Sequence, residues 1–280
     1  MNKPGISVVM SVYKAEIAKY LDEALESIWL HQTLKPNEIV LIEDGPLTDA
    51  LYRVINRWKE SLGETLVIVQ NESNLGLTKS LNKGIATAQF EYIARMDSDD
   101  ICHPDRFSKQ FTYLQLHTDI DVVGGSIQEF NSQNECINVR QYPKTHEEAL
   151  TYIYKASPLA HPATMIRKSI FDNGLKYNEA YRTSQDIALW FDVIIKGGKI
   201  ANLDSIVLFF RQDDNIFKRR GRSKAINEFK IYLNGIRQIY GILTFKYMYP
   251  CARFIFRLMP EKIVARTYKG KFRKSFLRAK

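Results

Sequence analysis

Cysteine is scarce in this sequence. The 280 residues include three cysteines, Cys102, Cys136 and Cys251, which lie far apart along the chain. An odd, scattered set forms neither a paired metal motif nor a disulfide framework and is typical of a reducing cytoplasm. The first residues lead directly into an apolar run and lack the hydrophobic core of a signal peptide. We therefore expect a cytoplasmic protein.

Long hydrophobic runs and glycine-rich phosphate loops are also missing. A spanning helix needs roughly 20 apolar residues in a row, and the nearest candidate, 240–260, contains Lys246, Arg253 and Arg257. No G-x-G-x-x-G follows the first apolar run, and no G-x-x-x-x-G-K-[ST] occurs anywhere. The sequence therefore predicts no spanning helix and argues against Rossmann dehydrogenases and P-loop NTPases.

Acidic residues are rare toward the C-terminal end. Residues 218–280 contain 18 Lys or Arg and two acids, Glu228 and Glu261, whereas residues 1–217 contain 22 Lys or Arg and 29 acids. The net charges of the two parts, +16 and −7, account for the +9 of the chain. We predict an acidic body at 1–217 and a basic tail at 218–280.

Strands and helices alternate along the body. Apolar, β-rich runs predict strands at 6–12, 38–42, 66–69 and 92–96, and helical spacing predicts helices at 20–29, 51–62 and 76–88. Such alternation forms right-handed crossovers and a parallel sheet, whose ligands bind at the carboxyl ends of the strands. The sequence therefore predicts an α/β fold with a mostly parallel central sheet flanked by helices.

The fourth predicted strand ends in three carboxylates, Asp97, Asp99 and Asp100. Like charges this close repel one another, so a nearby cation should neutralise them. Mg²⁺ and Mn²⁺ prefer such oxygen ligands and share them with phosphate oxygens and water. One interpretation is a metal that holds a diphosphate, and the alternative is a solvated Asp/Ser turn.

Two other predicted strands end in polar residues. Ser11 and Tyr13 lie at the end of the first strand, and Asp44 lies just beyond the end of the second. Because the carboxyl ends of parallel strands meet at one edge of a sheet, these side chains should lie near the acidic triplet. The alternatives are a core position for Tyr13 and a turn role for Asp44 ahead of Gly45.

Five segments have the order and spacing of one known family over residues 5–212. They are SVVMSVYK at 7–14, EIVLIEDGPLT at 38–48, NLGL at 74–77 with NKG at 82–84, ARMDSDD at 94–100 and QDIALW at 185–190. Together they resemble glycosyltransferase family 2, in particular the bacterial O-antigen and exopolysaccharide enzymes of amylovoran type. The resemblance implies a GT-A fold with a Rossmann-like nucleotide-sugar-binding half at 1–100 and an acceptor-binding half at 101–217.

The resemblance implies roles for the residues at the strand ends. Asp44 accepts the N3–H of uracil, and Ser11 and Tyr13 line the nucleotide pocket. Asp97 lies near the ribose and diphosphate, and Asp99 binds the divalent metal, Mn²⁺ or Mg²⁺, with Asp97 as a second ligand.

The neighbours of this metal pair have more than one interpretation. Arg95 either offsets the charge beside the nucleotide-sugar or is a structural partner of Asp44 or Asp100. Asp100 is expected to support the turn rather than to bind the metal.

Gln185-Asp186 matches the family's Glu/Gln-Asp pair, whose aspartate is the general base of inverting members. The resemblance therefore makes Asp186 the base that deprotonates the acceptor hydroxyl and Gln185 an acceptor residue. The structural alternative is a capping box of Thr183 and Asp186 before a helix at 187–195. His161 lies where family members line the acceptor pocket, and the alternative is a hydrogen-bonded loop histidine.

The basic tail needs its own explanation. Apolar residues recur at helical spacing from Ile226 to Tyr240, and further apolar residues follow among arginines. A basic amphipathic segment of this kind favours an anionic membrane surface. Nucleic-acid binding is disfavoured because the body is acidic and no RNA or DNA motif is present.

These expectations combine into one function. We expect an inverting, metal-dependent enzyme that moves a hexose, glucose or galactose, from a UDP-sugar to a lipid-linked (undecaprenyl diphosphate) saccharide. It should act as a peripheral protein at the inner face of the bacterial inner membrane. The alternatives are a non-catalytic nucleotide-sugar-binding or membrane-scaffolding protein and a sugar-1-phosphate nucleotidyltransferase.

Overall fold

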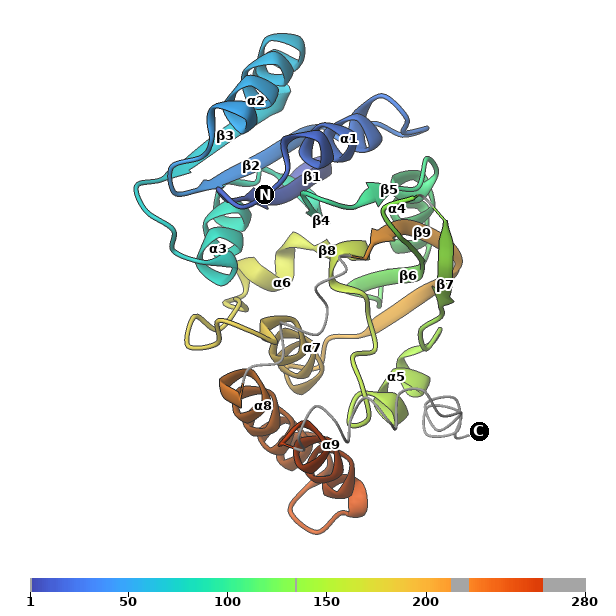
Figure 1. Ribbon diagram of the computed structural model, residues 1–280. Helices are drawn as coiled ribbons and strands as arrows, with labels where there is room; N and C mark the ends of the chain where they lie inside the picture. Colours follow the sequence, from blue (N-terminus) through green and yellow to red (C-terminus); the bar gives the residue numbers. More distant parts are fainter. Residues whose placement is uncertain (1, 134, 213–221, 259–280) are drawn as a thin grey trace.

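The computed structural model describes residues 2–133, 135–212 and 222–258 (Figure 1). Within them, nine strands form one sheet in the order β3-β2-β1-β4-β8-β6-β9-β5, with β7 paired to β6. The strands are β1 (Lys3–Val12), β2 (Glu38–Asp44), β3 (Leu66–Asn71), β4 (Phe90–Asp97), β5 (Ile101–Cys102), β6 (Val122–Phe130), β7 (Cys136–Arg140), β8 (Met165–Arg167) and β9 (Ile200–Arg211).

Nine α-helices are present in the described parts of the chain. They are α1 (Ala18–Trp29), α2 (Asp49–Leu62), α3 (Leu77–Thr87), α4 (Arg106–Leu116), α5 (His146–Tyr152), α6 (Lys168–Asp172), α7 (Gln185–Ile195), α8 (Arg222–Tyr240) and α9 (Met248–Leu258). Every strand and helix predicted above is found, with ends that differ by a few residues. None of the described helices is long and apolar enough to span a membrane.

The N-terminal half of the sheet is parallel. Strands β3, β2, β1 and β4 pair in parallel, and α1, α2 and α3 connect them as crossovers. Helix α3 lies close to the sheet because a Cβ on Gly84 would come within 2.5 Å of Ile42 Cδ1 and 2.8 Å of Val9 Cγ1. The α/β prediction is confirmed for this half.

The second half of the sheet is mixed. Strand β8 is antiparallel to both β4 and β6, whereas β6 and β9 are parallel. One face of the whole sheet packs against α1, α2 and α4, and the other packs against α3 and α7. The mostly parallel arrangement thus describes the N-terminal half, and β8 introduces the change of direction.

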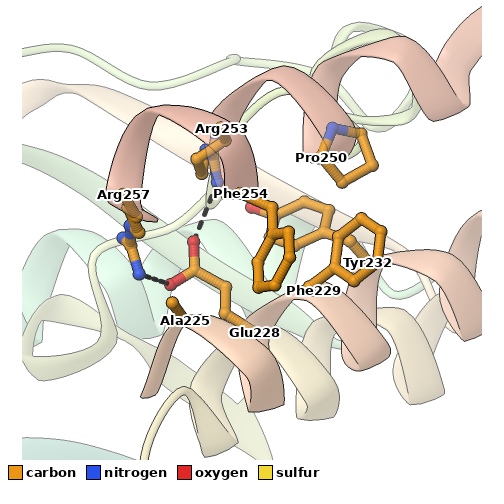
Figure 2. Close-up of a pocket in the computed structure, with 8 residues that line it drawn as sticks. All are labelled: Ala225, Glu228, Phe229, Tyr232, Pro250, Arg253, Phe254 and Arg257. Carbon is orange, nitrogen blue, oxygen red and sulfur yellow. Dashed lines mark hydrogen bonds and ion pairs between the residues drawn. The ribbon is translucent and has the colours of Figure 1, made fainter. Parts of the chain in front are cut away.

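The C-terminal helices form a hairpin on α7. Tyr232 of α8 contacts Phe191 of α7 edge to face, with ring centroids 5.6 Å apart, and Gly235 permits this approach because a Cβ would lie 2.2 Å from Phe191. Glu228, buried in α8, accepts from Arg253 at 3.1 Å and pairs with Arg257, which joins α8 to α9 (Figure 2). Helix α8 is therefore anchored on both sides by protein.

The apolar stripe predicted for the tail helix is used for this packing. Phe229 stacks on Phe254 at 4.6 Å, Ile236 is fully buried, and the Tyr240 hydroxyl donates to Leu150 O. Most of the stripe faces protein because α7 and α9 cover it, whereas Ile226 is 41% exposed. The predicted boundary between residues 217 and 218 lies outside the described residues.

Candidate active site at the carboxyl ends of β1, β2 and β4

Strand alternation brings the predicted residues to one face of the sheet. Side chains two positions apart share a face, so Asp44 lies on the same side as Ile42, and Asp97 on the same side as Ile93. Both apolar residues pack in the core between the sheet and helices α3 and α7. Ser11 lies directly opposite Asp97 in the β1–β4 register. The predicted convergence of the three strand ends is present.

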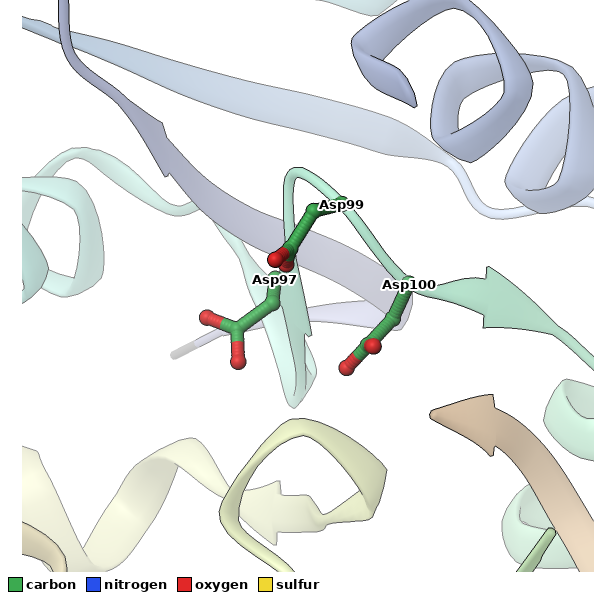
Figure 3. Close-up of side chains that lie close together, drawn as sticks. All are labelled: Asp97, Asp99 and Asp100. Carbon is green, nitrogen blue, oxygen red and sulfur yellow. The ribbon is translucent and has the colours of Figure 1, made fainter. Parts of the chain in front are cut away.

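The acidic triplet is a compact group of oxygens. Asp97 ends β4, and Asp99 and Asp100 lie on the turn that leads to β5 (Figure 3). One carboxylate oxygen from each residue lies within 4.8 Å of the others. Hard oxygen ligands in this arrangement suit Mg²⁺ or Mn²⁺.

Asp100 holds the turn, as predicted. Its Oδ1 accepts from the backbone N–H of Arg211 at 2.9 Å, and Arg211 Nε donates to the carbonyl of Asp99 at 2.9 Å. Burial raises the pKa of Asp100 well above its ordinary value, and the charges of Asp97 and Asp99 raise it further. Asp100 Oδ2 is buried and has no hydrogen-bond partner, which suits a proton or a bound cation at this atom.

Arg95 is the cation of the site. It is 3% exposed, and its guanidinium pairs with Asp97, which is neither of the structural partners considered above. Burial alone would lower the pKa of Arg95, but the Asp97 carboxylate reverses this and leaves the pKa raised. Its Nε and one terminal nitrogen are buried without an acceptor. Such unpaired donors are costly and are suited to an anionic or hydroxyl-bearing ligand.

Asp44 has a structural task in the free protein. Its Oδ1 accepts from the backbone N–H of Leu75 at 2.7 Å and from Asn71 Nδ2 at 3.1 Å, and its Oδ2 accepts from the N–H of Gly76 at 3.0 Å. These bonds hold the loop before α3 against the end of β2. Oδ2 keeps one lone pair, because each carboxylate oxygen accepts two hydrogen bonds.

Asp186 lies in the first turn of α7, and the predicted capping box is absent. The N-cap is Ser184, in a left-handed conformation with φ 61°, and it makes no side-chain cap hydrogen bond. The Thr183 hydroxyl is buried without a partner. The capping-box interpretation is therefore wrong, because the helix begins at Gln185 and the chain turns too sharply for Thr183 to reach it.

The environment of Asp186 shifts the pKa of its carboxyl group. Burial raises its pKa, while a hydrogen bond from the Ile187 N–H and the charge of Arg95 act in the opposite direction. Glu228 of α8 adds a further upward contribution. Raised pKa values at buried carboxylates in clefts are common for general bases.

His161 is buried in the 3₁₀ turn η2 (His161–Ala163). Its Nε2 and the hydroxyl of Tyr177 are 2.6 Å apart, and its ring lies edge to face with Trp190 at 6.1 Å. Burial, with a smaller contribution from Arg95, lowers its pKa well below the ordinary value, so it is neutral at pH 7. The hydrogen-bonded alternative thus has its partner in Tyr177, and the role of His161 toward an acceptor stays a prediction.

The remaining predicted residues lie at the edges of the site. Tyr13 is 41% exposed, which excludes the core alternative. Gln185 is buried at the first position of α7, next to Asp186. Their roles toward nucleotide and acceptor stay predictions.

Sequence reasoning missed two residues of the site. Tyr177 is buried, contacts His161, and interacts electrostatically with Arg95, Asp186 and Asp97. Arg211 ties the acidic turn to Glu23 of α1 through a 2.6 Å ion pair. The position of Arg211 at the end of a strand could have indicated its role. Tyr177 lies in an irregular segment, where the sequence pattern gives no such signal.

Solved structures share this fold. The chain is similar to S. aureus TarS, residues 1–349, in complex with UDP-GlcNAc, with 19% identity, 93% of this chain and 83% of that one covered, and a TM-score of 0.61. It is also similar to a mannosyltransferase from Pyrobaculum calidifontis in complex with GDP-Man and Mn²⁺, with 14% identity, 96% and 77% covered, and a TM-score of 0.65. The GT-A type of fold is confirmed.

Sequence relatives agree with the fold. An amylovoran biosynthesis glycosyltransferase of Erwinia amylovora is 33% identical over 94% of this chain and 97% of its own length. An Escherichia coli UDP-Gal:α-D-GlcNAc-diphosphoundecaprenol β-1,3-galactosyltransferase is 28% identical over 97% and 98%. The model of glycosyl transferase family 2 matches residues 7–175. The resemblance seen in the motifs is thus confirmed, and this chain belongs to glycosyltransferase family 2.

Proposed function

We propose that this enzyme transfers a hexose, glucose or galactose, from a UDP-sugar to a lipid-linked saccharide with inversion at the anomeric carbon. One observation carries the proposal: Arg95 pairs with Asp97 of the acidic triplet and also interacts electrostatically with Asp186. A candidate diphosphate site and a candidate base therefore both lie close to Arg95. An inverting transfer needs this arrangement, because leaving group and attacking hydroxyl occupy opposite sides of one carbon.

The acidic triplet supports a divalent metal at the diphosphate. Asp99 and Asp97 would hold it, and the orphaned Oδ2 of Asp100 lies in the same group of oxygens. When bound, such an ion neutralises the charge that the diphosphate gains as UDP leaves. The similar mannosyltransferase was solved with Mn²⁺.

Asp186 is the proposed base. Its carboxylate would accept the proton of the acceptor hydroxyl as that oxygen attacks the sugar. The hydrogen bond from the Ile187 N–H fixes its direction, and partial burial raises its pKa toward that of an effective base. A single displacement with one base and no covalent nucleophile inverts the anomeric configuration.

The proposed acceptor is a saccharide on a lipid diphosphate, such as undecaprenyl diphosphate. The E. coli relative is named for transfer to GlcNAc-diphosphoundecaprenol, and it aligns over 97% of this chain. Such acceptors are membrane-bound, so we place the enzyme peripherally at the cytoplasmic face of the inner membrane.

The stereochemistry of the product tests the proposal. With UDP-glucose and UDP-galactose offered to GlcNAc-diphosphate on a short, water-soluble alkyl chain, we expect a β-linked disaccharide from one of the two α-linked donors. NMR coupling constants of the anomeric proton distinguish the two linkages. An α-linked product would contradict the single displacement, and UDP binding without transfer to any acceptor would support the non-catalytic alternative.

The nucleotide base tests the role of Asp44. Uracil carries a proton on N3, which the remaining lone pair of Oδ2 can accept, whereas cytosine has a bare acceptor there that would face the carboxylate. A hydrogen bond to a charged group contributes about 1.5–3 kcal/mol, so UDP should bind about 10- to 100-fold more tightly than CDP or ADP in calorimetry. Thymidine diphosphate shares the N3 proton and should bind like UDP. Equal affinities for UDP and CDP would remove Asp44 from base recognition.

A further inference from the structure

The turn between α8 and α9 carries an unusual group of exposed apolar side chains. Leu243 is 98% exposed, Met248 69%, Ile242 68% and Phe245 66%. They lie within seven consecutive residues, and no other stretch of the described chain contains as many large exposed apolar residues. A contiguous patch of this kind on a soluble surface marks a binding surface. We call residues 242–248 the hairpin tip.

Local hydrogen bonds fix the conformation of the hairpin tip. Gly241 ends α8 with φ +80°, and its N–H donates to the carbonyl of Arg237 at 3.1 Å. Thr244 then accepts from the N–H of Lys246, which starts a short 3₁₀ turn and leads into α9. These caps fix the turn while its apolar side chains point outward.

Helix α9 exposes apolar side chains, whereas its arginines are paired with a buried acid. Its arginines, Arg253 and Arg257, both pair with Glu228 of α8 (Figure 2). Its outward arc carries Met248 and Ile255, 69% and 58% exposed, one above the other at i and i+7. A helix beside water normally exposes charge and buries such residues. The tip and this face of α9 therefore form one apolar surface.

Basic residues surround this surface. Lys246 lies over the rings of Tyr154 and Tyr240, at 5.1 and 4.6 Å, and Lys155 lies 5.7 Å from the ring of Tyr249. In residues 222–258 the one acidic residue is Glu228, which is buried and paired. The chain beyond α9, residues 259–280, contains eight Lys or Arg and one acid. Residues 222–258 therefore present no exposed acid that would repel an anionic surface.

We infer that the hairpin tip and the outward face of α9 insert into an anionic lipid bilayer. Apolar side chains, an aromatic–lysine border and flanking cations are the composition of an interfacial membrane anchor. In Figure 1 the tip, drawn in orange, is at the end of the molecule farthest from α2. Helix α8 packs on α7, which carries Asp186. Insertion of the tip would therefore fix the distance between α7 and the bilayer surface.

This inference deepens the proposed function, since a lipid-linked acceptor requires an enzyme at a bilayer, but its test needs no substrate. The full-length protein is mixed with vesicles of phosphatidylethanolamine and phosphatidylglycerol and sedimented. Burial of one leucine or phenylalanine in hydrocarbon strengthens partitioning by roughly tenfold or more. The double variant Leu243→Ser, Phe245→Ser should therefore bind at least about tenfold more weakly, also in high salt, where electrostatic attachment alone is screened.

A matched control and a direct reporter complete the test. Leu116→Ser removes another exposed leucine, 76% exposed at the end of α4, and should leave vesicle binding unchanged. In the Leu243→Trp variant, the emission of the introduced tryptophan should shift to the blue on vesicle binding. Brominated lipid should quench this emission. The double variant should keep its melting temperature and its transfer to a water-soluble acceptor.

Three results would overturn the inference. They are wild-type vesicle binding by the double variant, unchanged tryptophan emission in the presence of vesicles, and a change from dimer to monomer in the double variant without loss of vesicle binding. The last would mean that a second copy of the chain covers the tip. Loss of transfer to a soluble acceptor would concern the proposed reaction, whereas vesicle binding measured without donor or acceptor concerns the tip alone.

Discussion

Asp186→Asn is expected to lower kcat by about 10²–10⁴-fold while UDP binding and the fold are kept. Asparagine preserves the shape of the side chain and one acceptor oxygen, but it cannot take a proton. No capping box with Thr183 is lost, and the amide oxygen of asparagine can keep the hydrogen bond from the Ile187 N–H. The stability cost should therefore be about 1 kcal/mol or less, mainly from the helix dipole. Steady-state kinetics, calorimetry with UDP and thermal melting measure the three quantities.

The pH profile adds a second readout for the same variant. Since burial raises the pKa of Asp186, activity should be lost as pH falls through a value above that of an ordinary aspartate. Arg95 opposes this rise, Glu228 adds to it, and the nearby Tyr177 and His161 are neutral at pH 7. The acidic limb of kcat/KM should disappear in Asp186→Asn.

Asp192→Asn is the matched control. Asp192 lies on the same helix, and burial raises its pKa as well, but its charged neighbour is Lys196 on the far end of α7. This variant should keep wild-type kcat. Equal activity of the Asp186 variant and the wild type would exclude Asp186 from the chemistry.

Removal of the divalent metal is expected to abolish turnover. EDTA should stop the reaction, and Mn²⁺ or Mg²⁺ should restore it in the wild type. A bound metal contributes several kcal/mol to such a transition state, so Asp99→Ala should lower kcat/KM by at least about 10³-fold. Added metal should not rescue this variant, because the second ligand, Asp97, is already paired with Arg95.

Asp99 is a cleaner target than its neighbour Asp100. The bond from Arg211 Nε goes to the backbone carbonyl of Asp99, which the substitution keeps, whereas Asp100→Ala would remove an acceptor of the Arg211 N–H. Asp204→Ala serves as control, since Asp204 is an exposed acid that pairs with Lys144 at 2.8 Å. Full activity of the wild type in EDTA would refute the metal role.

Local pattern in the sequence was enough to predict the strand-end half of the site. Periodicity of two along β1, β2 and β4 sets which side chains share a face. Ser11, Asp44 and Asp97 follow apolar residues that must be buried, so their own direction is determined. Parallel pairing then brings the strand ends to one edge, as predicted.

The opposite wall of the site could not be predicted in the same way. His161, Tyr177 and Asp186 come from irregular segments or a helix start more than 60 residues after Asp97. Their approach depends on β8 and α7 packing beside β4, which involves contacts between distant parts of the chain. For this reason the contacts of Arg95 with Tyr177 and Asp186 and the missing cap at Thr183 became visible only in three dimensions.

The C-terminal helices also show what sequence periodicity leaves undetermined. Helical spacing from Ile226 to Tyr240 correctly predicted an amphipathic helix, because periodicity reports that one side avoids water. It does not report what covers that side. Helices α7 and α9 cover most of it, and the larger exposed apolar surface lies at the hairpin tip and on α9. Composition and periodicity thus determined the elements and the chemistry available at the strand ends, while tertiary packing decided which faces meet, because only packing sets the distances between remote segments.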